Sequence, residues 1–387
     1  MTTPPEHYVG REQAYVKHFL FRNYFSDLIH KIASVYGSVV YIDGFSGPWQ
    51  SGSDDFADTS FGIALEAMRS AKQTWNQKGR NVQMHAFLVE ANQKAFQELE
   101  KVPARYPDIA VRPYQGEFVP LVPTILKAMP PDSFAFIFID PKGWRIDIDA
   151  IAPLLRWPKA EVLYNFMFDF INRAALMSDS AIVSGLDALV KSGNWRQRLI
   201  EVEPTAGGTI ADRRKEILVD AFSQTLSQVG RYEFVAETPI FRPYADRTLY
   251  SLIYATRRAP GIEVFRRTQI KTLQEQEVIR KSAQQTKASG AQMEAFRPPE
   301  MTPSETEAYL ATERTNAQEM LLELASATRN ARSYGDIWPR VLAKHAVTKD
   351  DLNKIAAALR KEGKLIFPEW EKTKRVPSDN WNVYKRL

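Results

Sequence analysis

The chain contains no cysteine. This absence excludes disulfide bridges, cysteine-ligated zinc, iron–sulfur clusters and a catalytic thiol. Long apolar runs are missing too: no window reaches the ~18 uninterrupted apolar residues of a membrane-spanning helix, so we expect no membrane segment. The first residues, MTTPPEHYVGREQ, have no basic stretch followed by an apolar one. We therefore expect no secretory signal and a cytoplasmic location.

The charge of the chain is small overall but concentrated at one end. Of 387 residues, 44% are hydrophobic and 25% are charged, which is the balance of an ordinary globular protein of two or three domains. The net charge is +5, and residues 334–387 hold all of it, with 12 Lys and Arg against 7 Asp and Glu. Such a local excess is typical of a phosphate-binding module, although a basic solvated surface gives the same count.

Short apolar runs alternate with helical patterns through the N-terminal part of the chain. After a helix predicted over 12–36, strands are expected at 39–42, 84–89, 109–111, 134–139 and 162–166. This alternation indicates parallel pairing in a doubly wound α/β sheet. Near-continuous apolar strands such as FAFIFI (134–139) suit a sheet that is covered on both faces.

Two further strands are expected at 232–237 and 249–255. The connection between them is too short for a crossover helix, so we predict an antiparallel pair. A mostly parallel sheet ending in an antiparallel pair is the pattern of class I methyltransferases, an analogy of fold that alone carries little weight for function. With a helix over 261–287, this first domain is predicted to span residues 1–287.

The rest of the chain is predicted to be a linker (288–303), a connecting helix (304–332) and a small domain (333–387). Helices at 336–345 and 349–362 followed by strands at 364–367 and 381–384 give the order of a winged helix-turn-helix domain. Basic residues on its second helix and between its strands are candidates to bind nucleic-acid phosphates, with a protein-docking surface as the alternative. These residues are Lys349, Lys354, Arg360, Lys361, Lys364, Lys372, Lys374 and Arg375.

The loop YIDGFSGPWQSGS (41–53) directly follows the first predicted strand. Asp43 ends the strand, and Gly44 and Gly47 free the loop from the conformational limits of larger residues, so its backbone can approach a ligand. Nucleotide-type cofactors bind outside the carboxyl ends of parallel strands. The loop is therefore a candidate cofactor site, with a purely structural turn as the alternative.

Acidic residues follow the next two strands. Glu90 ends the second strand, where a carboxylate can accept hydrogen bonds from both ribose hydroxyls. Its separation of 47 residues from Asp43 exceeds the usual ~20, and residues 53–80 supply the insertion. Glu117, after Gly116, is a candidate contact to an adenine ring, and Asn165 at the end of VLYNF (162–166) a candidate pocket residue.

The segment IDPKGW (139–144) follows the most apolar strand. The residue before a proline is held extended, so Asp140 should point out of the sheet edge. In amino methyltransferases such a strand end presents a hydrogen-bond acceptor to the nucleophilic nitrogen and an aromatic ring to the base. Asp140 and Trp144 are the candidate catalytic residues, although Trp144 lies one position later than the usual aromatic. A simple turn is the alternative, and His18 is more simply a surface or core residue.

Six segments together resemble the three-Cys-motif partner proteins, TcmP, over residues 12–266. They are YVKHFLFRNYF (15–25), YIDGFSGPW (41–49), FLVEANQKAF (87–96), FIFIDPKGW (136–144), VLYNFMFDFINR (162–173) and LIYATRRAPGIEVFR (252–266). The resemblance implies a Rossmann-fold methyltransferase that uses S-adenosylmethionine, with a three-Cys-motif protein as partner. It also implies that Asp43, Gly44 and Gly47 form the cofactor loop, that Glu90 holds the ribose and that Asp140 faces the methyl acceptor.

The leading hypothesis is a methyltransferase whose winged helix brings it to nucleic acid, to DNA ahead of RNA. The first alternative is a non-catalytic, nucleotide-binding partner protein. The second is a metal-dependent nuclease that uses the strand-end carboxylates as ligands; no histidine accompanies them, so we expect no metal.

Overall fold

The computed structural model describes residues 8–47, 56–203, 209–244, 247–289, 304–325 and 332–385. The chain divides into two compact units at Arg257 and Arg258. Helix α11 (Ala259–Ser289) belongs to the C-terminal unit, so the division falls earlier than the sequence-based boundary at residue 287. Of the predicted linker, residues 290–303 lie outside the described residues.

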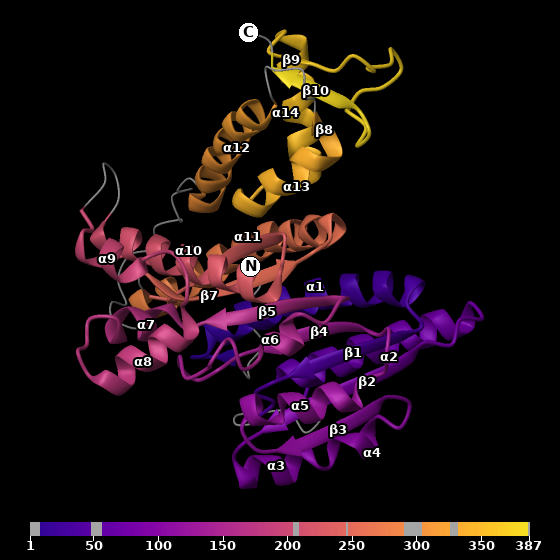
Figure 1. Cartoon of the computed structure of the whole chain (residues 1–387), viewed down its shortest axis with the longest axis vertical. Coiled ribbons are helices and arrows are strands. Elements are labelled where there is room, and N and C mark those ends of the chain that lie inside the picture. Colours follow the sequence, from indigo (N-terminus) through magenta and orange to yellow (C-terminus); the bar gives the residue numbers. More distant parts are fainter. Residues whose placement is uncertain are drawn as a thin grey trace. The chain divides into compact units, whose positions relative to one another are not determined.

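The described part of the larger unit contains a seven-stranded sheet in the order β3-β2-β1-β4-β5-β7-β6 (Figure 1). Strands β1 to β5 pair in parallel, whereas β7 is antiparallel to both β5 and β6. The mostly parallel α/β sheet and its antiparallel end are therefore confirmed. The strands are β1 (Ser38–Asp43), β2 (Gln83–Glu90), β3 (Ala110–Gln115), β4 (Phe134–Ile139), β5 (Ala160–Phe166), β6 (Phe234–Phe241) and β7 (Thr248–Thr256).

Helices cover both faces of this sheet. Successive side chains of a strand point to opposite faces, and in β4, with the sequence FAFIFI, the side chains on both faces are apolar and buried. On one face, Phe21 of α1 (Glu12–Val35) stacks on Phe138 of β4 with ring centroids 5.0 Å apart. On the other, Ile137 and Ile139 of β4 share a core with α5 (Phe118–Ala128), α6 (Ala152–Leu155) and α10 (Ile210–Gly230). The remaining helices are α2 (Ser60–Gln77), α3 (Gln93–Leu99), α4 (Val102–Arg105), α7 (Phe168–Ala174), α8 (Ser180–Leu189) and α9 (Trp195–Ile200).

The strand order reverses beside β1. The chain runs from β1 outward through β2 to β3, and then returns to place β4 on the other side of β1. Such a reversal opens a crevice at the carboxyl ends of the neighbouring strands, where ligands of open α/β sheets bind. Asp43, Glu90 and Asp140 all lie at this edge, because β1, β2 and β4 are parallel.

The smaller unit joins helices to a small antiparallel sheet of strand order β8-β10-β9. Arg266 of α11 is buried and its guanidinium donates to the backbone oxygens of Leu342 (2.5 Å) and Ala343 (2.9 Å), at the end of α13. β8 is two residues long and too short to be visible as a sequence pattern. The elements are α12 (Glu305–Leu324), β8 (Arg332–Ser333), α13 (Tyr334–Lys344), α14 (Lys349–Lys361), β9 (Leu365–Ile366) and β10 (Asn382–Lys385).

None of the helices in the ranges given above is both long enough and apolar enough to cross a bilayer.

Candidate functional site

A cavity of about 860 Å³ lies at the carboxyl edge of the sheet in the larger unit. This volume falls within the usual size range of small-molecule sites. Its wall comes from the start of α1, from the loops after the parallel strands and from the start of β7. The predicted residues that it brings together are Gly44, Gly47, Glu90, Glu117, Asp140 and Asn165, whereas Asp43 and Trp144 do not line it.

Asp43 is fully buried and organises the loop after β1. Its carboxylate accepts hydrogen bonds from the Tyr41 hydroxyl (2.9 Å), the Phe45 backbone N–H (3.0 Å) and the Ser60 hydroxyl (2.7 Å). Burial raises the pKa of Asp43 above its ordinary value, against the effect of these hydrogen bonds. These three hydrogen bonds use both carboxylate oxygens. Asp43 therefore lies behind the cavity wall, where it holds the loop in place.

The first N–H groups of the loop are also bonded within the protein. The Gly44 N–H donates to the Phe138 backbone oxygen (3.1 Å), and the Ser46 N–H donates to that of Val89 (2.7 Å). Gly44 is needed for space: a Cβ there would lie 2.9 Å from Cγ of Phe118. The glycine therefore allows β1 to lie close to α5, and the N–H groups of Gly44 and Ser46 are engaged within the protein.

Glu90 and Glu117 lie on the part of the wall formed after β2 and β3. Glu90 is 5% exposed, and its Oε1 accepts a hydrogen bond from the Asn92 backbone N–H at 2.5 Å. Among the described residues, nothing bonds to its Oε2. Glu117 is exposed at the N-cap of α5 and makes no capping bond there.

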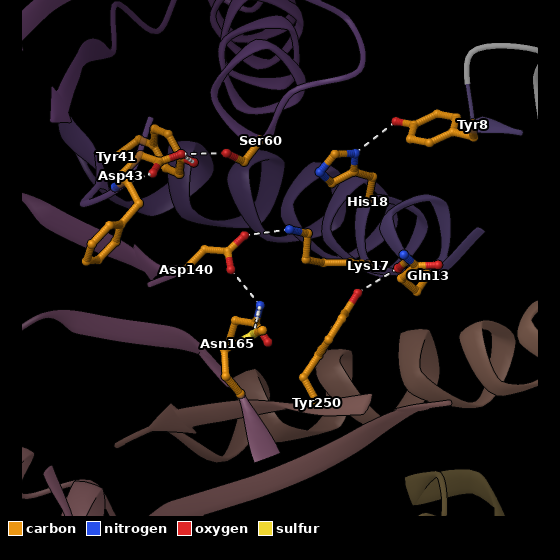
Figure 2. Close-up of polar contacts among 12 residues, drawn as sticks. Tyr8, Gln13, Lys17, His18, Tyr41, Asp43, Ser60, Asp140, Asn165 and Tyr250 are labelled. Carbon is orange, nitrogen blue, oxygen red and sulfur yellow. Dashed lines mark hydrogen bonds and ion pairs between the residues drawn. The ribbon is translucent and has the colours of Figure 1, made fainter. Parts of the chain in front are cut away.

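Asp140 stands between a cation and an amide (Figure 2). Its Oδ2 accepts a hydrogen bond from Lys17 Nζ of α1, and its Oδ1 accepts one from Asn165 Nδ2 of β5, each at 2.5 Å. Donation to the carboxylate fixes the orientation of the Asn165 amide. Asn165 is 3% exposed, and its Oδ1 is buried with no hydrogen-bond partner in the described part of the chain. The wall therefore holds a carboxylate paired with a cation and, beside it, an unused acceptor oxygen.

Trp144 does not line this cavity, although the next residue, Arg145, does. Its indole is the nearest neighbour of Gly185 in α8, where a Cβ would lie 3.3 Å from Nε1, and it packs against the core. Stacking of Trp144 on a methyl acceptor stays a prediction that this placement does not favour.

Sequence reasoning missed the contribution of α1. Lys17 and His18 both line the cavity, and His18 is 6% exposed with its Nδ1 hydrogen-bonded to the Tyr8 hydroxyl (2.8 Å). Tyr250 of β7 donates its hydroxyl hydrogen to the Gln13 backbone oxygen (2.6 Å) and so ties the other side of the cavity to α1. The available signal was the adjacent polar pair Lys17 and His18 in the second turn of the predicted helix.

The carboxylates at the strand ends do not gather into a metal site. In the ranges that the structure describes, no three His, Asp or Glu side chains lie close enough to hold a metal ion. The nuclease alternative therefore gains no support from the geometry.

The predicted phosphate-binding residues of the smaller unit differ in their surroundings. Lys349 is half-buried, with its Nζ 2.9 Å from a carboxylate oxygen of Asp379 and 4.3 Å from the Trp338 ring centroid. It therefore has little freedom to meet a phosphate. The other seven are exposed: Lys354, Arg360, Lys361, Lys364, Lys372, Lys374 and Arg375.

No family model and no curated protein matches the chain. Among solved structures, the putative methyltransferase yhhF from Escherichia coli is 12% identical, covers 61% of this chain and 86% of its own, and has a TM-score of 0.26. A Legionella pneumophila protein of the DUF519 family model is 9% identical over 62% of this chain and 85% of its own, with a TM-score of 0.36. A putative class I S-adenosylmethionine-dependent methyltransferase from Listeria monocytogenes is 11% identical over 66% of this chain and 61% of its own, with a TM-score of 0.25. Similarity this low carries no argument about this chain, and the resemblance to TcmP stays a prediction.

Proposed function

We propose that the larger unit is an S-adenosylmethionine-dependent methyltransferase whose acceptor is an amine nitrogen. The observation that carries this proposal is the pair formed by Asp140 and Asn165 at the cavity wall, where two side-chain oxygens can accept N–H hydrogens. The strand order, with β7 antiparallel, supports it as the topology of class I methyltransferases.

The residues present fit this cofactor. Oε2 of Glu90, which accepts no hydrogen bond from the described residues, is available to the ribose hydroxyls, in the position where an acidic residue after the second strand holds them. Val89, Phe118 and Val119 line the adjoining wall and suit a flat base, with Glu117 at its rim. Gly44 and Gly47 line the part of the cavity beside β1, where the methionine end of the cofactor would lie.

The bound cofactor supplies an electrophilic methyl group on a sulfonium, which makes the transfer an in-line displacement by the acceptor nitrogen. The protein's task is to orient the nitrogen. Asn165 Oδ1 would accept a hydrogen bond from one N–H of the acceptor. Asp140 would take the proton that the nitrogen loses as its bond to the methyl carbon forms and the carbon–sulfur bond of the cofactor breaks. Lys17 keeps Asp140 in position through their ion pair.

The acceptor class that we propose is nucleic acid, with the smaller unit as a winged helix that binds it. The sequence of α12, β8, α13, α14, β9 and β10, together with the sheet order β8-β10-β9, supports a winged helix. Leu352, Ala356 and Leu359 bury one side of α14, so its exposed cations face solvent. Lys372, Lys374 and Arg375 occupy the exposed connection between β9 and β10.

Calorimetric titration with S-adenosylmethionine tests the proposal. Glu90→Gln should weaken binding by about 1–3 kcal/mol, because a buried charged acceptor becomes a neutral one. The matched control is Glu98→Gln. Glu98 is an exposed residue of α3 that pairs with Lys101, so this variant should bind the cofactor like the wild type. A wild-type chain that does not bind the cofactor would contradict the proposal, and so would a Glu90→Gln variant with unchanged affinity.

A further inference from the structure

The larger unit carries a cluster of arginines that the proposed chemistry does not use. Asp169, in the first turn of α7, has a side chain that is only 3% exposed, yet it forms ion pairs with three arginines. Arg242 Nη2 lies 2.8 Å away and Arg173 Nη2 3.3 Å away, and Arg247 is the third partner. Three guanidinium groups around one carboxylate leave a local excess of positive charge.

These guanidinium groups have donors to spare. Each carries five N–H donors, more than one carboxylate can engage. The side chains of Arg242, Arg247 and Arg173 are 40%, 54% and 59% exposed, so each guanidinium group also faces solvent. Burial acts to raise the pKa of Asp169, but hydrogen bonds from Arg247 and Arg242 hold that pKa below its ordinary value. The carboxylate therefore stays ionised and fixes the arginines in place.

Two exposed aromatic rings accompany the arginines. Phe170 is 43% exposed, and the guanidinium carbon of Arg173 lies 4.9 Å from its ring centroid. Tyr244 is 51% exposed and lies in the connection between β6 and β7, between Arg242 and Arg247 in sequence. Exposed rings beside arginines are the combination with which proteins bind single-stranded nucleic acids, since the rings stack on bases and the guanidinium groups bind phosphates.

The elements that carry this surface continue into the wall of the cavity. Met167, directly before α7, lines the cavity. Leu249 and Tyr250 of β7, which come shortly after Arg247 in the sequence, line it too. A strand held on the arginines and rings would therefore lead towards the cavity, whose wall includes Asn165.

We infer that Arg173, Arg242, Arg247, Phe170 and Tyr244, here called the arginine–aromatic patch, bind single-stranded nucleic acid beside the cavity. The phosphates lie on the arginines, and an unstacked base lies against a ring. This deepens the proposed function, on which it rests for the statement that the bound strand is the methyl acceptor.

Fluorescence anisotropy of the full chain with labelled single-stranded RNA, single-stranded DNA and a duplex tests the inference. The background carries Lys372→Ala, Lys374→Ala and Arg375→Ala, so that binding by the smaller unit is reduced. In this background, Arg173→Gln with Arg247→Gln should weaken single-strand binding at least tenfold. It should also reduce the slope of log K against log salt by about 1.4, because two phosphates are no longer neutralised. Arg242 remains to pair with Asp169, and the single variant Arg173→Gln tests the same point if the double variant does not fold.

The matched control is Lys159→Gln, at the opposite end of β5, where the side chain is 36% exposed and paired with Asp132. It should leave binding unchanged. Phe170→Ala and Tyr244→Ala should each lower affinity several-fold without changing the salt slope, since a ring carries no charge. A loss seen with RNA alone or DNA alone supports the inference and identifies the strand.

Unchanged affinity in the folded arginine variants would overturn the inference. So would tighter binding of the duplex than of either single strand, or equal binding of a poly-glutamate peptide. The same variants should bind S-adenosylmethionine like the wild type. If the wild-type chain does not bind S-adenosylmethionine, the proposed function is wrong instead. The calorimetric titration described above measures that outcome independently of nucleic-acid binding.

Discussion

Asp140 is held by two side chains that come from distant parts of the sequence, Lys17 and Asn165. The residue before Pro141 was predictable as an acceptor at the sheet edge, because a strand end and a proline fix its direction. Its partner Lys17 was not, because the contact depends on how α1 lies across the carboxyl ends of the strands. For Asp43 the position at the end of β1 was predictable, but the three hydrogen bonds that hold its carboxylate behind the cavity wall were not.

Asp140→Ala should retain affinity for S-adenosylmethionine and slow methyl transfer by about 100-fold or more, the usual range for removal of a proton-accepting group. Transfer of a labelled methyl group and calorimetry measure the two effects. Asp147→Ala is the control, because Asp147 is exposed a few residues further along and does not line the cavity. If Asp140→Ala lowers both cofactor affinity and melting temperature, Asp140 has a structural role.

At the scale of elements, every strand of the large sheet overlaps a strand expected from the sequence, and β1, β2, β4 and β5 are the apolar runs that were recognised. β3 and β6 extend beyond the predicted 109–111 and 232–237, because their later residues include polar ones and a proline that give no apolar pattern. The antiparallel pairing of β6 and β7 was predicted from their short connection and is confirmed. The extent of α11 was predicted to within two residues at each end. The two-residue strand β8 and the place of α11 in the smaller unit were not predictable, because they depend on packing within that unit rather than on a local pattern.

The approach of β1 to α5 gives a test of packing. Gly44→Ala should destabilise the fold by about 1–3 kcal/mol, because its Cβ would lie 2.9 Å from a ring atom of Phe118 that cannot easily move. Urea denaturation measures the change. Gly37→Ala, where a Cβ meets nothing within 4 Å, should cost far less, and Phe118→Leu should restore part of the stability of the Gly44 variant. If Gly44→Ala and Gly37→Ala are equally stable, the packing of β1 against Phe118 of α5 leaves room for a Cβ at residue 44.

Helix α12 depends on a carboxylate from α11. Glu277 accepts hydrogen bonds from the Ser304 hydroxyl (2.6 Å) and the Thr306 N–H (3.2 Å) and pairs with Lys281 (2.7 Å). Burial acts to raise the pKa of Glu277, but these bonds outweigh it and lower the pKa to about 2. A lowered pKa means that the stabilisation is present above the ordinary value of 4.5 and is lost as pH falls towards 2.

Glu277→Gln should therefore reduce the stability of the chain at pH 7 by roughly 1 kcal/mol, the usual effect of a charge at a helix N-terminus. The deficit should shrink between pH 4.5 and 2, as the wild-type carboxylate is protonated. Denaturant melts across this range measure it, with the exposed Glu319→Gln of α12 as control. A deficit that is constant with pH would contradict the assignment.

At the scale of the whole molecule, the excess charge of residues 334–387 was visible in the composition, but its distribution over the surface was not. Replacing Lys372, Lys374 and Arg375 by Ala in the full chain should weaken duplex DNA binding. It should also reduce the salt slope by about 0.9 for each phosphate that the variant no longer neutralises. Anisotropy at several salt concentrations measures both. Lys349→Ala should change the slope less, because Asp379 already holds its charge. Salt-independent binding would favour a protein-docking role for this unit.

The hydrogen bond between Tyr250 and Gln13 joins residues 237 positions apart, so both ends of the larger unit meet at the cavity. During synthesis, α1 leaves the ribosome before β7 and gains this neighbour only after β7 has emerged. The cavity wall is thus among the last parts of the unit to form, as expected for contacts of long sequence separation. Until then, the aromatic face of α1 has only part of its sheet to cover, and a nascent chain that stalls before β7 offers that face to chaperones and to aggregation.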